Sequence, residues 1–408
     1  MTPADLIPHL FRSEFSKICA VLSKTVGVDN LDSIEDIVSD TFLLALATWP
    51  YKGKPENPTA WLYTVAKNKT KNHLKRQALF RQKISGELQL ITSTVDELPI
   101  DFSDQSIVDS QLQLFFAICH PSIPVEAQVS LALRILCGFG IDEIANALLS
   151  TKETIHKRLY RAKAKLKAEK VTLQLPPESQ IESRLETVLT TLYLLYNEGY
   201  YSESQDAILR LELCQEAMRL TNSLIATPRT SLPAVKALYA LMCFHGSRFA
   251  ARKTETGQFI LLQDQDPTRW DDELISRGAY YLHEASQGES VSRFHLEASI
   301  AYWHTLKEDT PEKWKHILFL YDRLLQLVYS PIAALNRLVA VSKVYGNRQA
   351  IEEAKQLNLS TNHFYHVLLG ELYTGTDNAA AQASYHQAFL WAKTETDKQT
   401  IRQKLNSF

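Results

Sequence analysis

The spacing of apolar residues constrains the fold of this 408-residue chain more than any other feature of its sequence. In almost every segment, apolar side chains recur three and four positions apart, and alternating runs rich in Val, Ile and Thr are few. The 13 Gly and 15 Pro fall mainly between these segments, where they interrupt helices. The sequence therefore predicts an all-α protein, and its length suggests about two to four domains.

Charge is arranged in blocks along the first 173 residues. Residues 67–83 contain seven basic side chains and no acidic one, residues 84–133 contain no Lys or Arg, and a second basic cluster spans 152–170. The remainder is net acidic, which brings the formal charge of the chain to −2. A near-neutral total would count against nucleic-acid binding, because phosphate affinity comes from Lys and Arg, but two separate basic segments favour it.

Changes in composition and periodicity divide the chain into four segments. Residues 9–83 form a helical unit that ends in a Lys-rich helix, and residues 84–110 form an acidic linker. Residues 111–173 form a second, smaller helical unit. Pro176-Pro177 then separates it from a helical extension over 179–408, since two prolines cannot continue a helix.

The extension carries signs of an internal repeat. Its last part approximates the tetratricopeptide spacing of small, aromatic and apolar positions at Leu369, Gly370, Tyr373, Ala381, Tyr385 and Ala388. We therefore expect a helical repeat domain of tetratricopeptide (TPR) type, with antiparallel helix pairs of no named family as the alternative. Such a domain offers a groove for a protein or peptide regulator.

The cysteines and the termini indicate the compartment. The five cysteines form no C-x-x-C pair and are odd in number, which fits a reducing environment. The N-terminus shows no signal-peptide pattern, and no apolar run approaches the roughly 20 residues that span a bilayer. We expect a cytoplasmic protein without membrane association.

A helix-turn-helix pattern lies between Ile141 and Leu166. Ile144 and Ala145 mark a short amphipathic helix, and an apolar stripe from Ile155 to Leu166 marks a longer one. Such a second helix can enter the major groove of DNA. Its outward side chains include Lys152, Thr154, His156, Lys157 and Arg161, although an ordinary helical hairpin with a basic surface is the alternative.

The Lys-rich helix near Trp61 suggests a second DNA-binding surface. Asn68, Lys71, Asn72 and Arg76 fall off its apolar stripe, and Asn can read base edges while Lys and Arg attract phosphates. Trp49 and Tyr51 precede it, next to the basic loop around Lys52. Aromatic side chains beside basic ones are typical of single-stranded DNA binding.

Three segments together resemble the extracytoplasmic-function (ECF) sigma factors of the sigma-70 family. EDIVSDTF at 35–42 is similar to the core-polymerase-binding helix of region 2, whose usual pattern is EDLVQETF. AWLYTVAKN at 60–68 with NHLKR at 72–76 is similar to the promoter −10 helix. EIA at 143–145, TIHKRL at 154–159 and RAK at 161–163 are similar to region 4, which reads the −35 element.

The resemblance continues to the end of the chain. LYNEGY at 195–200, LQDQD at 262–266 and ALNR at 334–337 resemble the subgroup of these sigma factors with a long TPR-like C-terminal extension. Asn72 replaces the usual acidic residue of the −10 helix, Lys71 replaces an apolar one, and Leu149 and Ser150 depart from the usual turn of region 4. These departures concern the promoter sequence and leave the general activity unchanged.

The resemblance implies a transcription initiation factor whose partners are core RNA polymerase and promoter DNA. It implies no cofactor, no metal and no catalytic residue. Polymerase binding falls on Glu35, Asp36, Asp40 and Thr41. DNA binding falls on Trp49, Tyr51, Asn68, Lys71, Asn72 and Arg76 for the −10 element, and on Lys152, Thr154, His156, Lys157, Arg158 and Arg161 for the −35 element.

Two other classes of protein remain as alternatives. A helix-turn-helix transcriptional regulator with a helical-repeat sensor domain would need DNA and no polymerase. A repeat scaffold or enzyme would not depend on the basic helices. Within the sigma-factor interpretation, an acidic linker would be attracted to the positively charged nucleic-acid channel of polymerase, or would simply remain solvated.

Overall fold

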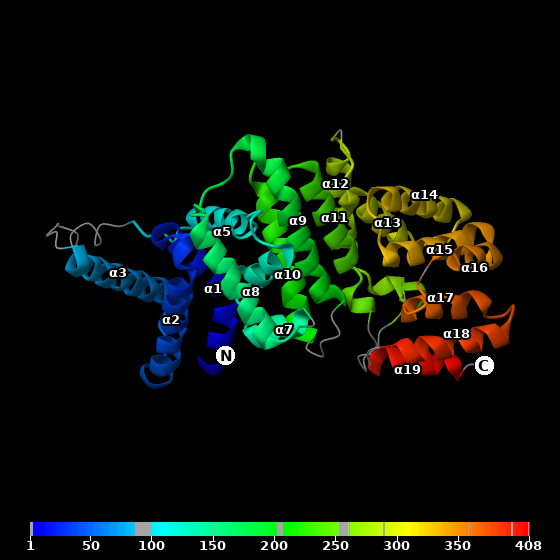
Figure 1. Cartoon of the computed structure of the whole chain (residues 1–408), viewed down its shortest axis with the longest axis horizontal. Helices are drawn as coiled ribbons and strands as arrows, with labels where there is room; N and C mark the ends of the chain where they lie inside the picture. The colour runs from blue at the N-terminus through cyan, green and yellow to red at the C-terminus, as the bar shows by residue number, and fades with distance from the viewer. Residues whose placement is uncertain are drawn as a thin grey trace. The chain divides into compact units, whose positions relative to one another are not determined.

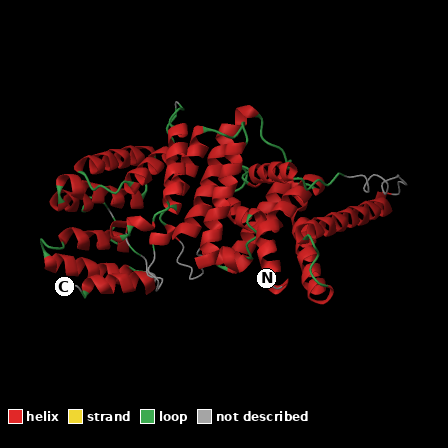
Figure 2. Cartoon of the chain, turned by 180° about the vertical axis from the view of Figure 1, so that it is seen from behind, coloured by secondary structure: helices red, strands yellow, loops and turns green. Residues whose placement is uncertain are grey.

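A computed structural model describes residues 3–85, 99–148, 150–201, 207–252, 260, 262–288, 290–357, 359–392, 395–406 and 408. Within these ranges every regular element is a helix and no strand occurs, as Figures 1 and 2 show. The predicted all-α class is confirmed. The chain divides into two compact units, residues 1–231 and 232–408.

The first unit contains the basic segments. Its helices are α1 (Pro3–Val26), α2 (Leu31–Lys52), α3 (Pro58–Ser85), α5 (Asp104–Ile118), α6 (Val125–Leu131), α7 (Ile141–Ala147), α8 (Lys152–Ala168), α9 (Glu178–Tyr201) and α10 (Ala207–Ala226). A 3-10 helix, η1 (Val28–Asn30), joins α1 to α2. A π-helix, η2 (Ala132–Leu136), follows α6.

Helix α1 lies at the centre of the first unit and packs against α2, α5 and η2. Phe15, Ile18 and Leu22 on α1 are fully buried. Such a long apolar helix forms because its buried side chains recur with helical spacing, and the hydrophobic effect stabilises it more than its intrinsic propensity does. Residues 3–85 and the helices after residue 103 therefore share one core.

The acidic linker is shorter than the sequence suggested. Residues 86–98 of the expected linker lie outside the described residues, but α5 already begins at Asp104. The side chain of Ser103 accepts a hydrogen bond from the Ser106 amide and caps this helix, and Asp104 lies in its first turn. A polar cap and an early carboxylate both favour a helix start, which explains why helical structure begins inside the acidic stretch.

The boundary of the extension also differs from the expected one. The sequence predicts that the extension begins at residue 179, yet α9 and α10 belong to the first compact unit and pack on α5 and α6. Arg219 on α10 donates to the Gln111 side chain at 3.2 Å, and Gln111 donates to Ser16 on α1 at 3.0 Å. This relay, whose Gln111–Ser16 bond is buried, ties the first pair of extension helices to α5 and α1.

The second unit consists of consecutive helix pairs. Its helices are α11 (Pro233–Gly246), α12 (Asp272–Ala285), α13 (Arg293–Thr305), α14 (Pro311–Leu327), α15 (Pro331–Tyr345), α16 (Asn347–Ala354), α17 (His363–Tyr373), α18 (Asn378–Trp391) and α19 (Glu395–Leu405).

The predicted repeat spacing corresponds to close packing between α17 and α18. A Cβ atom on Gly370 would come within 2.7 Å of the Tyr385 ring, so only glycine allows this approach. Tyr385 is 1% exposed, and Ala381 and Ala388 are fully buried. These are the positions at which the sequence matched the TPR pattern, and in α17 and α18 they pack against each other.

Candidate nucleic-acid interface

Helix α2 has one exposed edge within the first unit. Asp36 and Asp40, two of the predicted polymerase-binding residues, are exposed on it, one turn apart. Asp40 accepts a hydrogen bond from Lys69 at 3.3 Å, with 62% of the carboxylate side chain still in contact with solvent. An exposed ion pair of this kind is worth little, so the carboxylate can change partners readily.

The same helix exposes three leucines that the sequence analysis did not single out. Leu43, Leu44 and Leu46 are 59%, 38% and 47% exposed. Only Phe42 and Ala45 of this apolar run are buried. The signal was present in the sequence, because six consecutive apolar residues, Phe42 to Ala47, exceed what one face of a helix can bury. Exposed apolar residues beside carboxylates are typical of a protein-binding surface.

Two of the predicted polymerase contacts are not on the surface. Thr41 is fully buried, and its hydroxyl donates to the Ile37 carbonyl at 2.8 Å. The side chain of Glu35 is 9% exposed and forms ion pairs with Arg134 and Lys163. The prediction that Thr41 and Glu35 contact polymerase from the surface is therefore corrected. Both side chains are internal in this conformation.

The two aromatic residues that precede α3 differ sharply in exposure. Trp49 is 2% exposed and packs edge-to-face against Trp61, with ring centroids 5.3 Å apart. Tyr51 is 88% exposed, next to the exposed basic residues Lys52 and Lys54. Trp49 is thus a core residue and is unavailable for base stacking, whereas Tyr51 is available.

Helix α3 presents a regular polar stripe to solvent. Thr64, Asn68, Asn72 and Arg76 are all exposed and follow one another at intervals of four, so they lie along one face. Lys71 is partly buried and does not follow this interval of four, so it is not part of this stripe. Three of the four predicted α3 residues therefore share one surface, and Thr64 extends it.

Helices α7 and α8 form the helix-turn-helix. Thr151 caps α8, because its hydroxyl accepts a hydrogen bond from the Thr154 amide at 3.2 Å. The predicted inward stripe is buried as expected, at Ile155, Leu159, Ala162 and Leu166. Leu149, in the turn, lies outside the described residues. The local sequence thus produces a short helix followed by a longer, capped one whose apolar stripe is buried.

The predicted DNA-binding residues of α8 divide into exposed and partly buried ones. His156, Lys157 and Arg161 are exposed on its outer face. Lys152 is also exposed, but it pairs with Asp142 at 2.8 Å. Thr154 and Arg158 are partly buried. Tyr160, which the sequence analysis did not include, is 75% exposed beside Arg161 and adds an aromatic side chain to this face.

One lysine of α8 faces the protein. Lys163 contacts Asp32 at 2.7 Å and also pairs with Glu35, and only 14% of its side chain is exposed. Burial alone would lower the pKa of Lys163, but the charges of Glu35 and Asp32 raise it above its ordinary value. The ammonium group is therefore charged and held inside the first unit.

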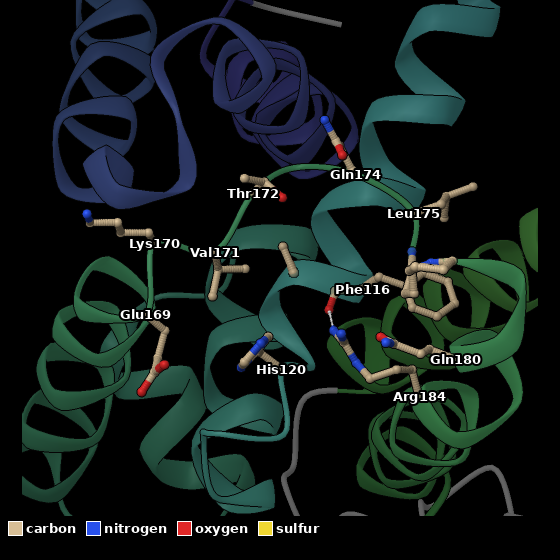
Figure 3. A pocket seen from close by; sticks show the side chains of 13 residues that line it. Phe116, His120, Glu169, Lys170, Val171, Thr172, Gln174, Leu175, Gln180 and Arg184 are labelled. Atoms are coloured by element: carbon tan, nitrogen blue, oxygen red, sulfur yellow. Dashed lines mark hydrogen bonds between the residues drawn. The ribbon is translucent and has the colours of Figure 1, made fainter.

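A polar cavity of about 280 Å³ lies where α8 ends and the extension begins. In Figure 3 the Arg184 side chain points toward the carbonyl oxygen of Phe116, to which it donates. Burial lowers the pKa of Arg184, and burial together with the Arg184 charge lowers the pKa of His120. Arg184 thus binds a carbonyl at the end of α5, which is a structural role.

The remaining reactive side chains are shielded. All five cysteines are free and buried, and burial raises the pKa of Cys119 and of Cys243 to about 12. Among the described residues no cluster of three or more potential metal ligands occurs. Across the same part of the chain, no helix is both long and apolar enough to span a bilayer.

Comparisons with protein families match two parts of the chain. Residues 10–80 match sigma-70 region 2, and this segment covers α2, most of α1 and most of α3. Residues 184–286 match a family of unknown function, DUF6596, which spans the boundary between the two compact units.

Two relatives extend this comparison. Uncharacterized protein R00370 of Rhizobium meliloti (strain 1021) is 31% identical over 386 residues, which are 92% of this chain and 90% of that protein. The ECF RNA polymerase sigma factor BldN of Streptomyces coelicolor is 30% identical over 131 residues, which are 31% of this chain and 47% of BldN. No solved structure matches the chain significantly.

Proposed function

Because the chain belongs to the ECF group of the sigma-70 family, in the subgroup with a long helical C-terminal extension, we propose that it binds core RNA polymerase and selects promoters. One observation carries this proposal. The segment that matches sigma-70 region 2 exposes an edge of carboxylates and leucines on α2 and a polar stripe on α3. One stripe suits a protein partner and the other suits DNA.

Polymerase binds the exposed edge of α2 in this proposal. Asp36 and Asp40 provide charge, and Leu43 and Leu46 provide apolar area that a partner can cover. An apolar centre with charged surroundings gives both affinity and orientation to a protein interface. Glu35 joins this surface only after it leaves Arg134 and Lys163.

The −10 element binds α3 and the loop before it. Tyr51 stacks on an unpaired base, while Asn68 and Asn72 donate to and accept from base edges. Arg76 and the neighbouring lysines neutralise phosphates. Thr64 lies on the same stripe and extends the surface toward the start of α3.

The −35 element binds the outer face of α8. Lys157 and Arg161 contact phosphates or guanine edges, and His156 and Tyr160 lie beside them. Lys152, Thr154 and Arg158 lie at the flanks of this face and orient the helix on the DNA backbone. No bond-forming chemistry belongs to the chain in this proposal, because polymerase synthesises the RNA.

The second unit regulates the sigma module by binding a protein or peptide. Support comes from its TPR-like helix pairs, since stacked pairs of this kind form extended binding surfaces. Transcription by the full chain, with and without a candidate regulator, measures this role. Identical promoter-dependent activity in a chain ending at Ser231 would refute it.

Co-elution with core polymerase tests the proposed polymerase contact. Leu43→Asp places a charge in the apolar centre of the interface, so we expect polymerase affinity to fall at least tenfold. Leu211→Asp is the matched control, because Leu211 is 43% exposed on α10, away from this edge. An equal loss of polymerase affinity in both variants would reject the α2 interface. A wild-type chain that binds promoter DNA but not polymerase would instead favour a helix-turn-helix transcriptional regulator.

A further inference from the structure

The cavity of about 280 Å³ beside the end of α8 belongs entirely to the first unit. Three segments line it: the end of α5 with the turn after it, the connector over 169–177, and the first two turns of α9. Figure 3 shows these segments around the labelled side chains. Sites for drug-sized ligands usually measure about 300–1,000 Å³, so this cavity suits a smaller molecule.

Positive charge is in excess around this cavity. Lys170 and Arg184 are the cations of its lining, and Glu169 contributes a carboxylate. Glu169 is exposed and already pairs with Lys165 at 2.9 Å, which lowers the pKa of Glu169. Because Lys165 neutralises this carboxylate, the charges of Lys170 and Arg184 favour an anionic ligand.

Arg184 has a hydrogen-bond donor without an acceptor. Its Nη2 donates to the Phe116 carbonyl, whereas its Nε is buried and has no hydrogen-bond partner among the described residues. Burial lowers the pKa of Arg184, but a guanidinium group keeps its charge at neutral pH. A buried charged donor without an acceptor is unfavourable, so a ligand oxygen at Nε would stabilise this side chain.

His120 supplies a second donor to the lining. Its Nδ1 accepts from the Ser122 amide at 3.3 Å and lies 2.8 Å from the Ser122 hydroxyl. Because Nδ1 is an acceptor, the proton of the neutral ring is on Nε2. Burial and the charge of Arg184 lower the pKa of His120, which keeps the ring neutral. Figure 3 shows His120 and Arg184 in the same part of the cavity.

Lys170 lies at the rim of the cavity. Its backbone has a φ of +50°, and its side chain is exposed. In Figure 3 this side chain extends outward from the connector. An ammonium group on a flexible four-carbon stem can turn toward an anion that enters, so Lys170 adds a second positive charge to the site.

We propose that this cavity binds a small ligand through a phosphate group. Arg184 Nε and His120 Nε2 donate to phosphate oxygens, and Lys170 adds charge at the rim. A phosphate group carries a charge of about −1.5 to −2 at pH 7, which matches two cations better than a single carboxylate does. The site needs neither polymerase nor promoter DNA, and it therefore goes beyond the proposed function.

Calorimetric titration of the full-length chain with sodium orthophosphate, at constant ionic strength, measures this binding. We expect a dissociation constant of about 1 mM or below, since two hydrogen bonds and a further charge hold the anion. Glycerol phosphate distinguishes the source of the phosphate group: tighter binding than orthophosphate indicates a phosphate ester, and weaker binding indicates free phosphate. Malonate is the matched dicarboxylate, and an equal affinity for malonate would overturn the choice of phosphate.

Two substitutions of His120 test its donor. Asn keeps an acceptor near Ser122 but is too short to place an N–H at the Nε2 position, whereas the longer Gln reaches it. His120→Asn should therefore weaken phosphate binding about tenfold, and His120→Gln should stay within about threefold of wild type.

Substitutions of the two cations test the charges. Arg184→Lys keeps the charge but removes Nε, so phosphate binding should weaken about tenfold. Lys170→Gln should weaken it about threefold, because it removes an exposed charge from the rim. Lys167→Gln is the matched control, since Lys167 is exposed one turn earlier and lies outside the lining. The exposed position of Lys170 keeps the test possible if Arg184→Lys does not fold.

Three results would overturn the inference. The first is no heat of binding in the wild type at about 10 mM orthophosphate. The second is wild-type affinity in His120→Asn and Arg184→Lys, with circular dichroism showing both folded. The third is loss of binding in Lys157→Glu with Arg161→Glu, which would place the phosphate on the outer face of α8. Since the titration contains no polymerase and no DNA, each of these results leaves the proposed sigma function intact.

Discussion

Helices α3 and α8 are both rich in lysine and arginine, but they use these residues differently. On α3 the exposed stripe from Thr64 to Arg76 is free of the core, and its neighbour Lys69 makes only an exposed contact to Asp40 at 3.3 Å. On α8, Lys157 and Arg161 face solvent while Lys163 is held between Asp32 and Glu35. The same helix therefore carries a binding surface and an internal anchor.

The difference shows that basic charge on a helix does not by itself indicate a DNA contact. The position of each residue relative to the buried stripe determines whether its charge reaches solvent. Lys163 follows buried Ala162 directly and lies beside a carboxylate cluster, whereas Lys157 and Arg161 lie on the opposite side. Variants at these positions can separate the two uses of charge.

The largest effect is expected for Trp49, near the end of α2. Trp49→Ala should lower the free energy of unfolding by about 3–5 kcal/mol, because it removes a buried indole that packs on Trp61. Tyr51→Ala should change stability by less than about 0.5 kcal/mol, since its side chain is exposed. Urea denaturation measures the free energy of unfolding of both variants. A loss as small in Trp49→Ala as in Tyr51→Ala would show that Trp49 is not a core residue.

Reversal of charge on the outer face of α8 should give the next largest effect. Lys157→Glu with Arg161→Glu should reduce transcription from a promoter with a −35 element about 100-fold, which corresponds to about 3 kcal/mol. Lys165→Glu removes the same kind of charge from a locally paired position and serves as the control. Run-off assays at one fixed salt concentration compare them, and equal losses would remove α8 from the DNA interface.

A smaller effect is expected for the asparagines of α3. Asn68→Ala with Asn72→Ala should weaken promoter opening by about 2 kcal/mol, because amide contacts to base edges are lost. The salt dependence of binding should stay the same, since no charge is removed. Arg76→Ala should instead lower the salt slope by about one. A changed slope in the asparagine variant would contradict the assignment of base contacts.

Tyr160→Ala should have the smallest effect of this series. Its exposed ring lies beside Arg161, so its removal should weaken −35 binding by about 1 kcal/mol, or about fivefold, without loss of stability. Fluorescence anisotropy with a duplex that carries only the −35 element measures this change. Unchanged affinity would restrict the α8 surface to its charged residues.

The sequence alone predicted what depends on local periodicity. The inward stripe of α8 at Ile155, Leu159, Ala162 and Leu166 and the repeat spacing around Gly370 are both local patterns. The structure buries the stripe and packs Gly370 against Tyr385. Such patterns need only the helical repeat of 3.6 residues to place a side chain inside or outside.

Features that depend on distant residues could not be predicted in this way. Glu35 and Asp36 are adjacent acidic residues, and only Arg134 and Lys163, about a hundred positions later, explain why Glu35 is internal. The membership of α9 and α10 in the first unit likewise depends on contacts from Arg219 to Gln111. Trp49 and Tyr51 differ because one side chain meets Trp61 and the other meets solvent.

Run-off transcription with core polymerase on fragments of genomic DNA tests whether the chain is a promoter-selecting sigma factor. A sigma factor should give discrete transcripts that require both this chain and core polymerase, and Lys157→Glu with Arg161→Glu should remove those that depend on a −35 element. Lys165→Glu should retain them. The same transcripts without this chain, or none with it while the chain still binds DNA, would show that the chain does not act as a sigma factor.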